Sequence, residues 1–549
     1  MKIKEKIFSK YTLYVLCFII LNIFDVTREM RLVSLQIGQR YIRLEDVFPG
    51  YKIGDIWMIV TNLTGIVMMI IVVSGYKIKQ FVTKMNALWT GLCIIAMVVL
   101  PYVRTGKYGT ILIQEEIAIV NVWWIFLVVK EIFYKAIRKK KSPIKLNINI
   151  LLWIAMTLCM FFSVAFTNIW PIFYLGMFGC FYLTEYSKKD FEDLLNAMID
   201  GSILAFILMQ AVACFLRPYD SLRYVMLYSD CNSTALYYLI IYIMLLAKLH
   251  IFVVTKSRIW KKTVCVLLQG CVLSFLFMTG GRTVWGITMM IMFFYGVVVI
   301  KRIWNKNWLT VFVSGIILFC VTAAMLVPMY ELVRWIPTSV PARLWYQEEV
   351  EPGQFETEVL IGESKYSEKY VKLDELVGWL YRRFIRSFEL NSEYISRGNI
   401  YMTTSTIAVT NGLVVEATIP EISNKFRDSS LNARIEIFNM FFEELNWWGN
   451  NSSGMKYTHA HNLYLQIAYM YGIPAGILLI VLAFTLTIFQ YREIKRYRHN
   501  PYAIIPFMIC LAFFGVGIMG VVWVPGRLIM FLLFFIQYPF KQRLSVIEE

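Results

Sequence analysis

The sequence predicts an all-α polytopic membrane protein with about 12–14 transmembrane helices and one large, mostly helical hydrophilic loop. Of the 549 residues, 58% are apolar and 17% are charged, whereas a soluble domain has about 45–50% apolar and about 25% charged residues. The apolar residues also gather in runs of about 20, the length that spans the hydrocarbon core of a bilayer. This pattern excludes a soluble enzyme, a disordered chain and a small disulfide-rich scaffold.

About fourteen apolar runs meet this length criterion. They lie at residues 11–26, 54–75, 85–103, 110–130, 147–166, 168–184, 196–216, 233–254, 263–280, 283–300, 308–327, 463–490, 502–522 and 525–540. Asn22, Asp25 and Arg28 lie at or just beyond the end of the first run, where a signal peptide would have a small-residue cleavage site, so we expect a retained helix rather than a signal peptide. The predicted organisation is helices 1–11 in residues 1–327, a loop in 328–458 and helices 12–14 in 459–549.

The charge distribution predicts how the helices are oriented. The net charge is +17, but segment 328–458 holds 13 Lys/Arg and 18 Asp/Glu, so its own net charge is −5. The remaining basic residues lie mostly in short loops between apolar runs, as in the cytoplasmic loops of bilayer proteins. We therefore expect both termini in the cytoplasm, the large loop 328–458 outside it, and no nucleic-acid partner.

The large loop is too long to be a simple connector. Segment 371–390 repeats apolar residues at helical spacing and predicts an amphipathic helix. Segment 401–420 is rich in Thr, Val and Ile and predicts a strand or extended chain. Segment 430–448 again predicts a helix, which ends at Gly449.

Neither the cysteines nor the histidines have the spacing of a metal site. The ten cysteines lie in or beside apolar runs with no C-x-x-C pair, which is typical of buried free thiols. His459 and His461 are two residues apart with no cysteine and no H-E-x-x-H motif beside them. We expect no metal and no cofactor.

The two histidines lie where the large loop returns to the membrane, in Tyr457–Leu465. A histidine beside a cleft can act as a general base because its pKa lies near neutrality. The alternative is an interfacial pair without a chemical role.

Two arginines could clamp an anion. Arg282 lies in the turn Met278–Thr283 between two apolar runs, where Gly280 and Gly281 let a large anion approach the backbone. Arg434 lies near the start of the predicted helix 430–448. Together they could hold a diphosphate through bidentate hydrogen bonds. Alternatively, Arg282 is a charge that sets the topology of the membrane helices. The alternative for Arg434 is a side chain that is solvent-exposed or ion-paired.

Three further polar residues are candidates for binding a substrate. Glu115 and Glu116 lie inside the fourth apolar run, and intramembrane carboxylates are costly unless they have a function. They could also balance an arginine or reach the interface. Asn232, in Tyr228–Thr234, could bind a sugar or could cap the helix that follows.

Taken together, these motifs resemble the O-antigen ligase / O-antigen polymerase superfamily of membrane polysaccharide polymerases. The turn Gly-Gly-Arg282-Thr is similar to the family's Ser-Arg-Gly turn, with Gly281 in place of Ser, and Leu431–Arg434 resembles its arginine helix. His459-Ala-His461-Asn462-Leu-Tyr-Leu465, followed by Gly472 and Gly476, resembles its HNxxL…GxxG signature. Asp230-Cys-Asn232 resembles its D-P-N element, with Cys231 in place of Pro.

The resemblance implies a GT-C-like glycosyltransferase in the cytoplasmic membrane. It would join polyprenyl-diphosphate-linked oligosaccharide units into a surface polysaccharide, such as a capsule, at the outer face of the membrane, without a metal and with inversion. Arg282 and Arg434 would hold the diphosphate and His461 would be the general base. The remaining candidates would bind the donor or the glycan acceptor: His459, Asn462, Asn232, Glu115 and Glu116. A flippase and a chain-length regulator would be partner proteins.

Other functions remain open at this point. A ligase that moves a lipid-linked glycan onto lipid A core, a protein or a cell-wall acceptor would use the same site. A lipid-glycan flippase would need charges near the midplane and has little use for a large external loop. A non-catalytic scaffold is the third alternative.

Overall fold

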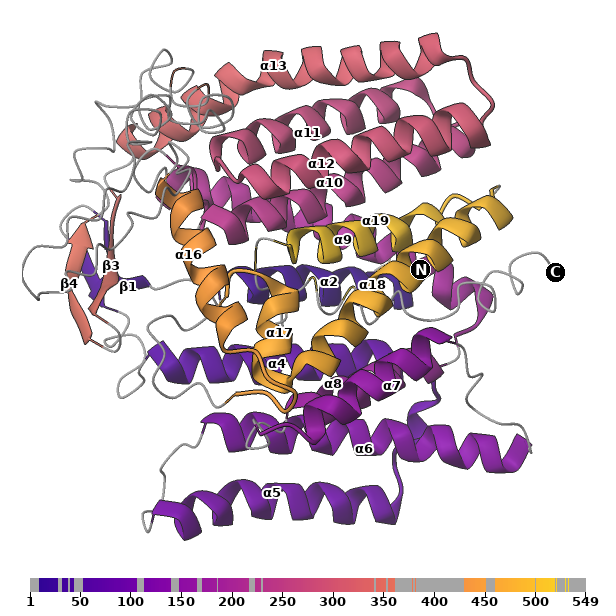
Figure 1. Ribbon diagram of the computed structural model, residues 1–549, viewed down its shortest axis with the longest axis vertical. Helices are drawn as coiled ribbons and strands as arrows, with labels where there is room; N and C mark the ends of the chain where they lie inside the picture. The colour runs from indigo at the N-terminus through magenta and orange to yellow at the C-terminus, as the bar shows by residue number, and fades with distance from the viewer. Residues whose placement is uncertain are drawn as a thin grey trace, which may run out of the picture.

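The computed structural model describes a bundle of helices with a small sheet at one end (Figure 1). The described residues are 9–27, 32–37, 40–43, 53–105, 113–139, 148–164, 170–184, 186–216, 223–228, 231–339, 342–351, 354–360, 378, 381, 429–450, 460–498, 500–518, 520, 529 and 532. Of the predicted loop segments, 401–420 lies outside these residues, as does nearly all of 371–390. The predicted last apolar run, 525–540, has only residues 529 and 532 within them.

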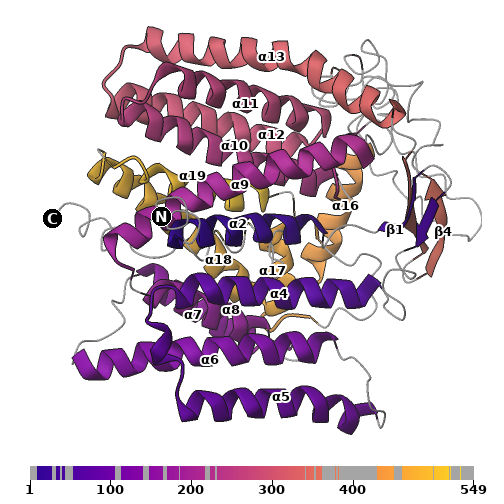
Figure 2. The same ribbon diagram turned by 180° about the vertical axis from the view of Figure 1, so that it is seen from behind.

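Most of the helices run side by side along one direction (Figures 1 and 2). Their bounds are α2 Lys10–Thr27, α4 Ile53–Val73, α5 Lys84–Thr105, α6 Ile113–Lys139, α7 Ile148–Phe161, α8 Trp170–Leu183, α9 Lys188–Leu216, α10 Cys231–Val254, α11 Ile259–Met278, α12 Arg282–Phe294, α13 Trp308–Ser339, α16 Ser429–Glu443, α17 Leu463–Tyr471, α18 Ile473–Arg496 and α19 Ile504–Val516. Two short segments complete the set, the 3-10 helix η1 Ile78–Gln80 and the π-helix η2 Tyr295–Ile303.

The helices confirm the prediction of a multi-pass membrane protein. Seven helices of the described chain are long and apolar enough to cross a membrane. They begin at Glu116, Lys189, Cys231, Ile259, Arg282, Trp308 and Ile473. Four shorter apolar helices lie within α4, α5, α7 and α19.

Burial distinguishes the centre of the bundle from its surface. The apolar window of α10 is 72% buried, whereas that of α13 is only 6% buried. Figures 1 and 2 accordingly show α10 inside the stack and α13 at its edge. Helix α13 packs against α11 on one side, and its exposed apolar side chains, such as Phe312 and Phe319, would contact lipid in a membrane.

Helix α13 continues past the predicted end of its apolar run at residue 327, so the predicted boundary at 328 falls within a helix. The extension reaches Ser339, and its Tyr330 and Val333 side chains are fully buried. Packing of these two side chains against the bundle explains why the helix continues into a more polar stretch.

A four-stranded antiparallel sheet, which the apolar pattern of the sequence does not predict, lies beside the bundle (Figure 1). Strands β1 Leu32–Ile37 and β2 Arg40–Arg43 follow α2, and strands β3 Ala342–Glu351 and β4 Gln354–Leu360 follow α13. The strand order is β2-β1-β3-β4, with Leu35 opposite Leu344. The sheet therefore joins the segment after α2 to the start of the predicted large loop.

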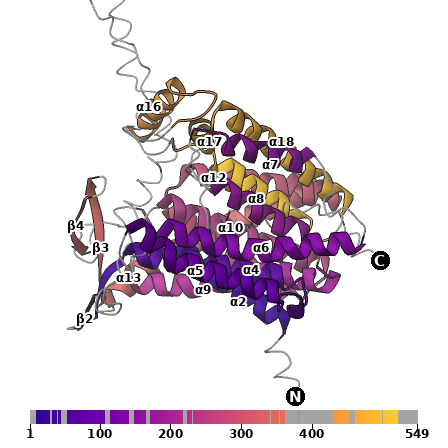
Figure 3. The ribbon, with the colours of Figure 1, turned by 90° about the horizontal axis from the view of Figure 1, so that it is seen from below.

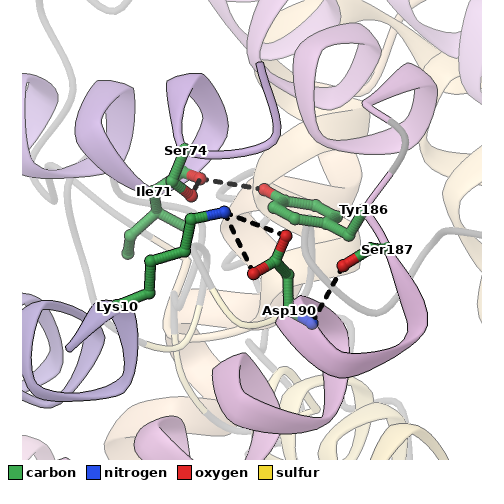
Figure 4. A network of polar contacts seen from close by, with 6 residues as sticks. All are labelled: Lys10, Ile71, Ser74, Tyr186, Ser187 and Asp190. Carbon is green, nitrogen blue, oxygen red and sulfur yellow. Dashed lines mark hydrogen bonds and ion pairs between the residues drawn. The ribbon is translucent and has the colours of Figure 1, made fainter. Parts of the chain in front are cut away.

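A polar network joins three helices at the end of the bundle away from the sheet (Figure 4). Lys10, the first residue of α2, forms an ion pair of 3.0 Å with Asp190 of α9. The Tyr186 hydroxyl donates to the carbonyl oxygen of Ile71 in α4, also at 3.0 Å. These contacts fix the positions of α2, α4 and α9, whose opposite ends lie toward the sheet.

Candidate functional site

A pocket with a volume of about 60 Å³, partly open to solvent, lies at the end of the bundle where α10 and α12 begin. Its walls come from the starts of α10 and α12, from α16 and from the end of α19. The lining residues are Asn232, Gly280, Gly281, Arg282, Thr283, Val284, Arg434, Val516 and Gly520. Three predicted site residues, Asn232, Arg282 and Arg434, therefore meet in one pocket although they lie far apart in the sequence.

The two glycines before Arg282 shape the turn between α11 and α12. Gly280 has a φ of 62°, a left-handed conformation that glycine adopts without steric cost. Gly281 approaches α10 so closely that a Cβ there would lie 2.8 Å from the Cβ of Ala235. The Thr279 hydroxyl accepts a hydrogen bond from the Gly281 amide at 3.2 Å. These contacts place Arg282 as the first residue of α12, at the rim of the pocket.

A short segment that includes residues 223–228 supports this turn from behind. The Arg223 Nε donates to the Thr279 carbonyl at 2.8 Å, and the Tyr224 amide donates to the Met278 carbonyl at 3.0 Å. The Arg223 Nη2 is buried and has no hydrogen-bond partner within the described chain. Sequence reasoning missed Arg223; a basic residue close before the Asn232 motif was the available signal.

Helix α16 carries Arg434 across the end of the bundle (Figure 1). Its Ile437 and Phe441 side chains are buried against α17, and the Phe441 ring meets the Tyr469 ring edge-on at 4.8 Å. Because residues three apart share one helix face, packing of Ile437 also turns Arg434 inward. The apolar contacts of α16 therefore orient its arginine toward the pocket.

His461 and Asn462 lie beside the wall that α19 contributes. The Asn462 Oδ1 accepts from the Leu465 amide at 2.9 Å and caps α17, while its Nδ2 donates to the Ile518 carbonyl at 2.8 Å. Ile518 lies between Val516 and Gly520 of the pocket lining. Both ends of the Asn462 amide are thus engaged within the protein. His461 is partly buried and is not part of the pocket lining.

The backbone of His461 has a φ of 49°. Such a left-handed conformation is uncommon for a residue with a side chain. The start of α17 is held in place by two further hydrogen bonds to the end of α19. The Leu463 amide donates to the Gly517 carbonyl at 2.7 Å and the Tyr464 hydroxyl donates to the Phe514 carbonyl at 2.8 Å.

The predicted carboxylates are not brought to the pocket. Glu115 and Glu116 belong to α6, which packs against α4, α5 and α8. Figures 1 and 2 show α6 and α12 on opposite sides of α2. The reason is topological, because α6 lies in the part of the bundle formed by the earlier helices. His459 lies outside the described residues.

The pocket has the chemistry of an anion site. Two guanidinium groups contribute fixed positive charge, and the N-terminus of a helix such as α12 carries a partial positive charge. Within the part of the chain that the structure describes, no three His, Cys, Asp or Glu side chains gather closely enough to hold a metal ion. A ligand with a diphosphate group would suit the pair of arginines, because each can form two parallel hydrogen bonds to phosphate oxygens.

Comparison of the chain with protein-family models, with curated proteins and with solved structures finds no match.

Proposed function

We propose that the chain is a GT-C-like membrane glycosyltransferase that joins polyprenyl-diphosphate-linked oligosaccharide units into a surface polysaccharide. The observation that carries the proposal is the pocket in which Arg282, Arg434 and Asn232 meet. The motif resemblance to the O-antigen ligase / O-antigen polymerase superfamily adds support, because two of its arginine motifs supply these side chains.

The proposed orientation follows from the basic loops. With both termini in the cytoplasm, the starts of α10 and α12 lie at the outer face of the cytoplasmic membrane, where the sheet and α16 also lie. A pocket at this level can receive a diphosphate at the lipid headgroups while the polyprenyl chain remains in the bilayer.

The proposed reaction is a single displacement at the anomeric carbon of the donor sugar. An acceptor hydroxyl oxygen forms the new bond while the bond to the diphosphate breaks, and the diphosphate leaves with the electron pair. Arg282 and Arg434 stabilise its developing charge. His461 accepts the proton from the attacking hydroxyl. One displacement inverts the anomeric configuration.

Two observations favour His461 as the base. It is joined to the pocket wall through Asn462, which donates to the Ile518 carbonyl. Its backbone is also held in a left-handed conformation, and such outliers are frequent at functional sites. The proposal gives Asn462 a positioning role, since its amide caps α17.

The test uses the purified full chain in nanodiscs with a polyprenyl-diphosphate-linked oligosaccharide and EDTA. We expect a ladder of repeat units for the wild type and its loss in His461→Ala, Arg282→Ala and Arg434→Ala. Arg258→Ala is the matched control, because Arg258 is exposed at the opposite end of α11 and makes no side-chain capping bond. Full-length ladders from both His461→Ala and Arg282→Ala would refute the assignment. No ladder with a verified donor, but transfer to an added glycan or protein acceptor, would identify a ligase.

A further inference from the structure

Four exposed apolar side chains form a patch at the end of the bundle where α7 ends and α18 begins. Phe162 and Val164 follow α7, and Trp447 and Trp448 follow α16. Each of the four is more than half exposed. The Val164 amide donates to the Trp448 carbonyl at 2.8 Å, so the two segments lie side by side. We call these four residues the aromatic patch.

The aromatic patch lies on a fixed backbone. The Ile473 amide donates to the Asn446 carbonyl at 3.0 Å, and the Asn446 side chain accepts from the Trp448 amide at 2.9 Å. Gly472 has a φ of 95°, and a Cβ there would collide with the Trp447 carbonyl oxygen. The two tryptophans are therefore held out from the protein by main-chain contacts, and their exposure is a property of the folded chain.

These contacts also set the level of the aromatic patch relative to the membrane. Ile473 is the first residue of α18, one of the helices long and apolar enough to cross a bilayer. Phe162 follows the last residue of α7, one of the shorter apolar helices. The patch thus lies where two membrane helices end. Figure 3 shows α7, α16, α17 and α18 together at one edge of the bundle.

The surface of these two helices continues the patch along the bundle. In α18 the exposed apolar side chains include Ile477, Val481 and Phe484, and in α7 they include Leu151 and Leu158. In a membrane protein this exposed apolar surface contacts acyl chains. The aromatic patch is therefore continuous with a lipid-facing surface rather than isolated in water.

We propose that the aromatic patch inserts into the interfacial region of the bilayer and contacts phospholipids there. Tryptophan suits this region because its ring is apolar while its N–H can bond to water or headgroups. Glu443 and Glu444 are exposed just before the two tryptophans. Their negative charge gives no attraction for anionic lipid, so the contact depends on the apolar rings. The inference rests on the membrane helices alone and holds whatever reaction the pocket performs.

The experiment places the photocrosslinking residue p-benzoylphenylalanine at Trp447 in the full chain, in nanodiscs of phosphatidylcholine with or without phosphatidylglycerol. Phe484, on α18, is the lipid-facing reference. Glu436 is the control. It is exposed on α16, two residues from Arg434, which lines the pocket. Intact peptide masses identify the adducts after irradiation.

We expect a phospholipid adduct at Trp447 and at Phe484, none at Glu436, and equal yields at Trp447 with and without phosphatidylglycerol. The absence of a lipid adduct at Trp447 while Phe484 reacts would overturn the proposal. An adduct at Trp447 with a second copy of the chain would also overturn it, because the patch would then be a protein interface. A yield that rises with phosphatidylglycerol would refute the apolar basis of the contact.

Discussion

Replacing Gly281 with alanine is expected to push the start of α12 away from α10 and to deform the pocket. The new Cβ would lie 2.8 Å from the Cβ of Ala235, whereas carbon atoms in contact lie about 3.5–4.0 Å apart. The start of α12 must then shift by about 1 Å, and overpacking of this kind costs about 1–3 kcal/mol. Because the φ of Gly281 is −76°, the cost comes from crowding and not from backbone strain.

The matched control is Gly286→Ala in the same helix. No heavy atom lies within 4 Å of a Cβ at Gly286, and alanine is the better helix former by about 1 kcal/mol. We expect Gly281→Ala to lower the apparent melting temperature in detergent and to lose the ladder of repeat units, while Gly286→Ala equals or exceeds the wild type in both assays. If Gly281→Ala melts like Gly286→Ala and gives full-length polymer, the close approach of α10 and α12 does not shape the pocket.

Substitutions at three further positions test the supports of the site. Arg223→Lys keeps the charge but loses the planar group that bonds to Thr279, so we expect a partial loss of polymer. We expect Arg223→Ala to lose more polymer, and ladders equal to that of the wild type from both variants would contradict this. Phe441→Ala should cost about 3–5 kcal/mol in the packing of α16, measured as faster proteolysis of α16, and an unchanged cleavage rate would refute it. Tyr464→Phe should cost about 1 kcal/mol by removing one hydrogen bond, seen as a small fall in melting temperature; no fall would show that the bond to Phe514 is not stabilising.

The membrane helices could be predicted because their signal is local. A run such as 233–254 contains enough apolar residues to span a bilayer by itself, and α10 occupies nearly the same range. The sheet could not be predicted in this way. Strands β1 and β2 are only six and four residues long, and β1 pairs with β3 about three hundred residues later. Short strands stabilised by distant partners carry little local pattern.

The site was predictable in part, for a similar reason. Arg282 stands out in the sequence because a charge between two apolar runs is costly without a function. Glu115 and Glu116 carry the same local signal, yet α6 packs far from α12. The cost of placing a charge in or beside an apolar run marks unusual residues in the sequence. Only the packing of the helices determines which of these residues share a pocket. Arg223 shows the converse: the sequence offers only a basic residue before the Asn232 motif, and its contact with Thr279, 56 residues later, depends on the fold.

One short helix, α17, contacts the supports of both the arginine motif of α16 and the histidine motif. Helix α17 carries Asn462 at its start, which bonds to the end of α19 beside the pocket wall, and Tyr469, which packs against Phe441 of α16. A shift of α17 therefore moves Arg434 and His461 together. The proposed clamp and the proposed base would therefore both depend on the position of α17, which contacts the neighbours of each.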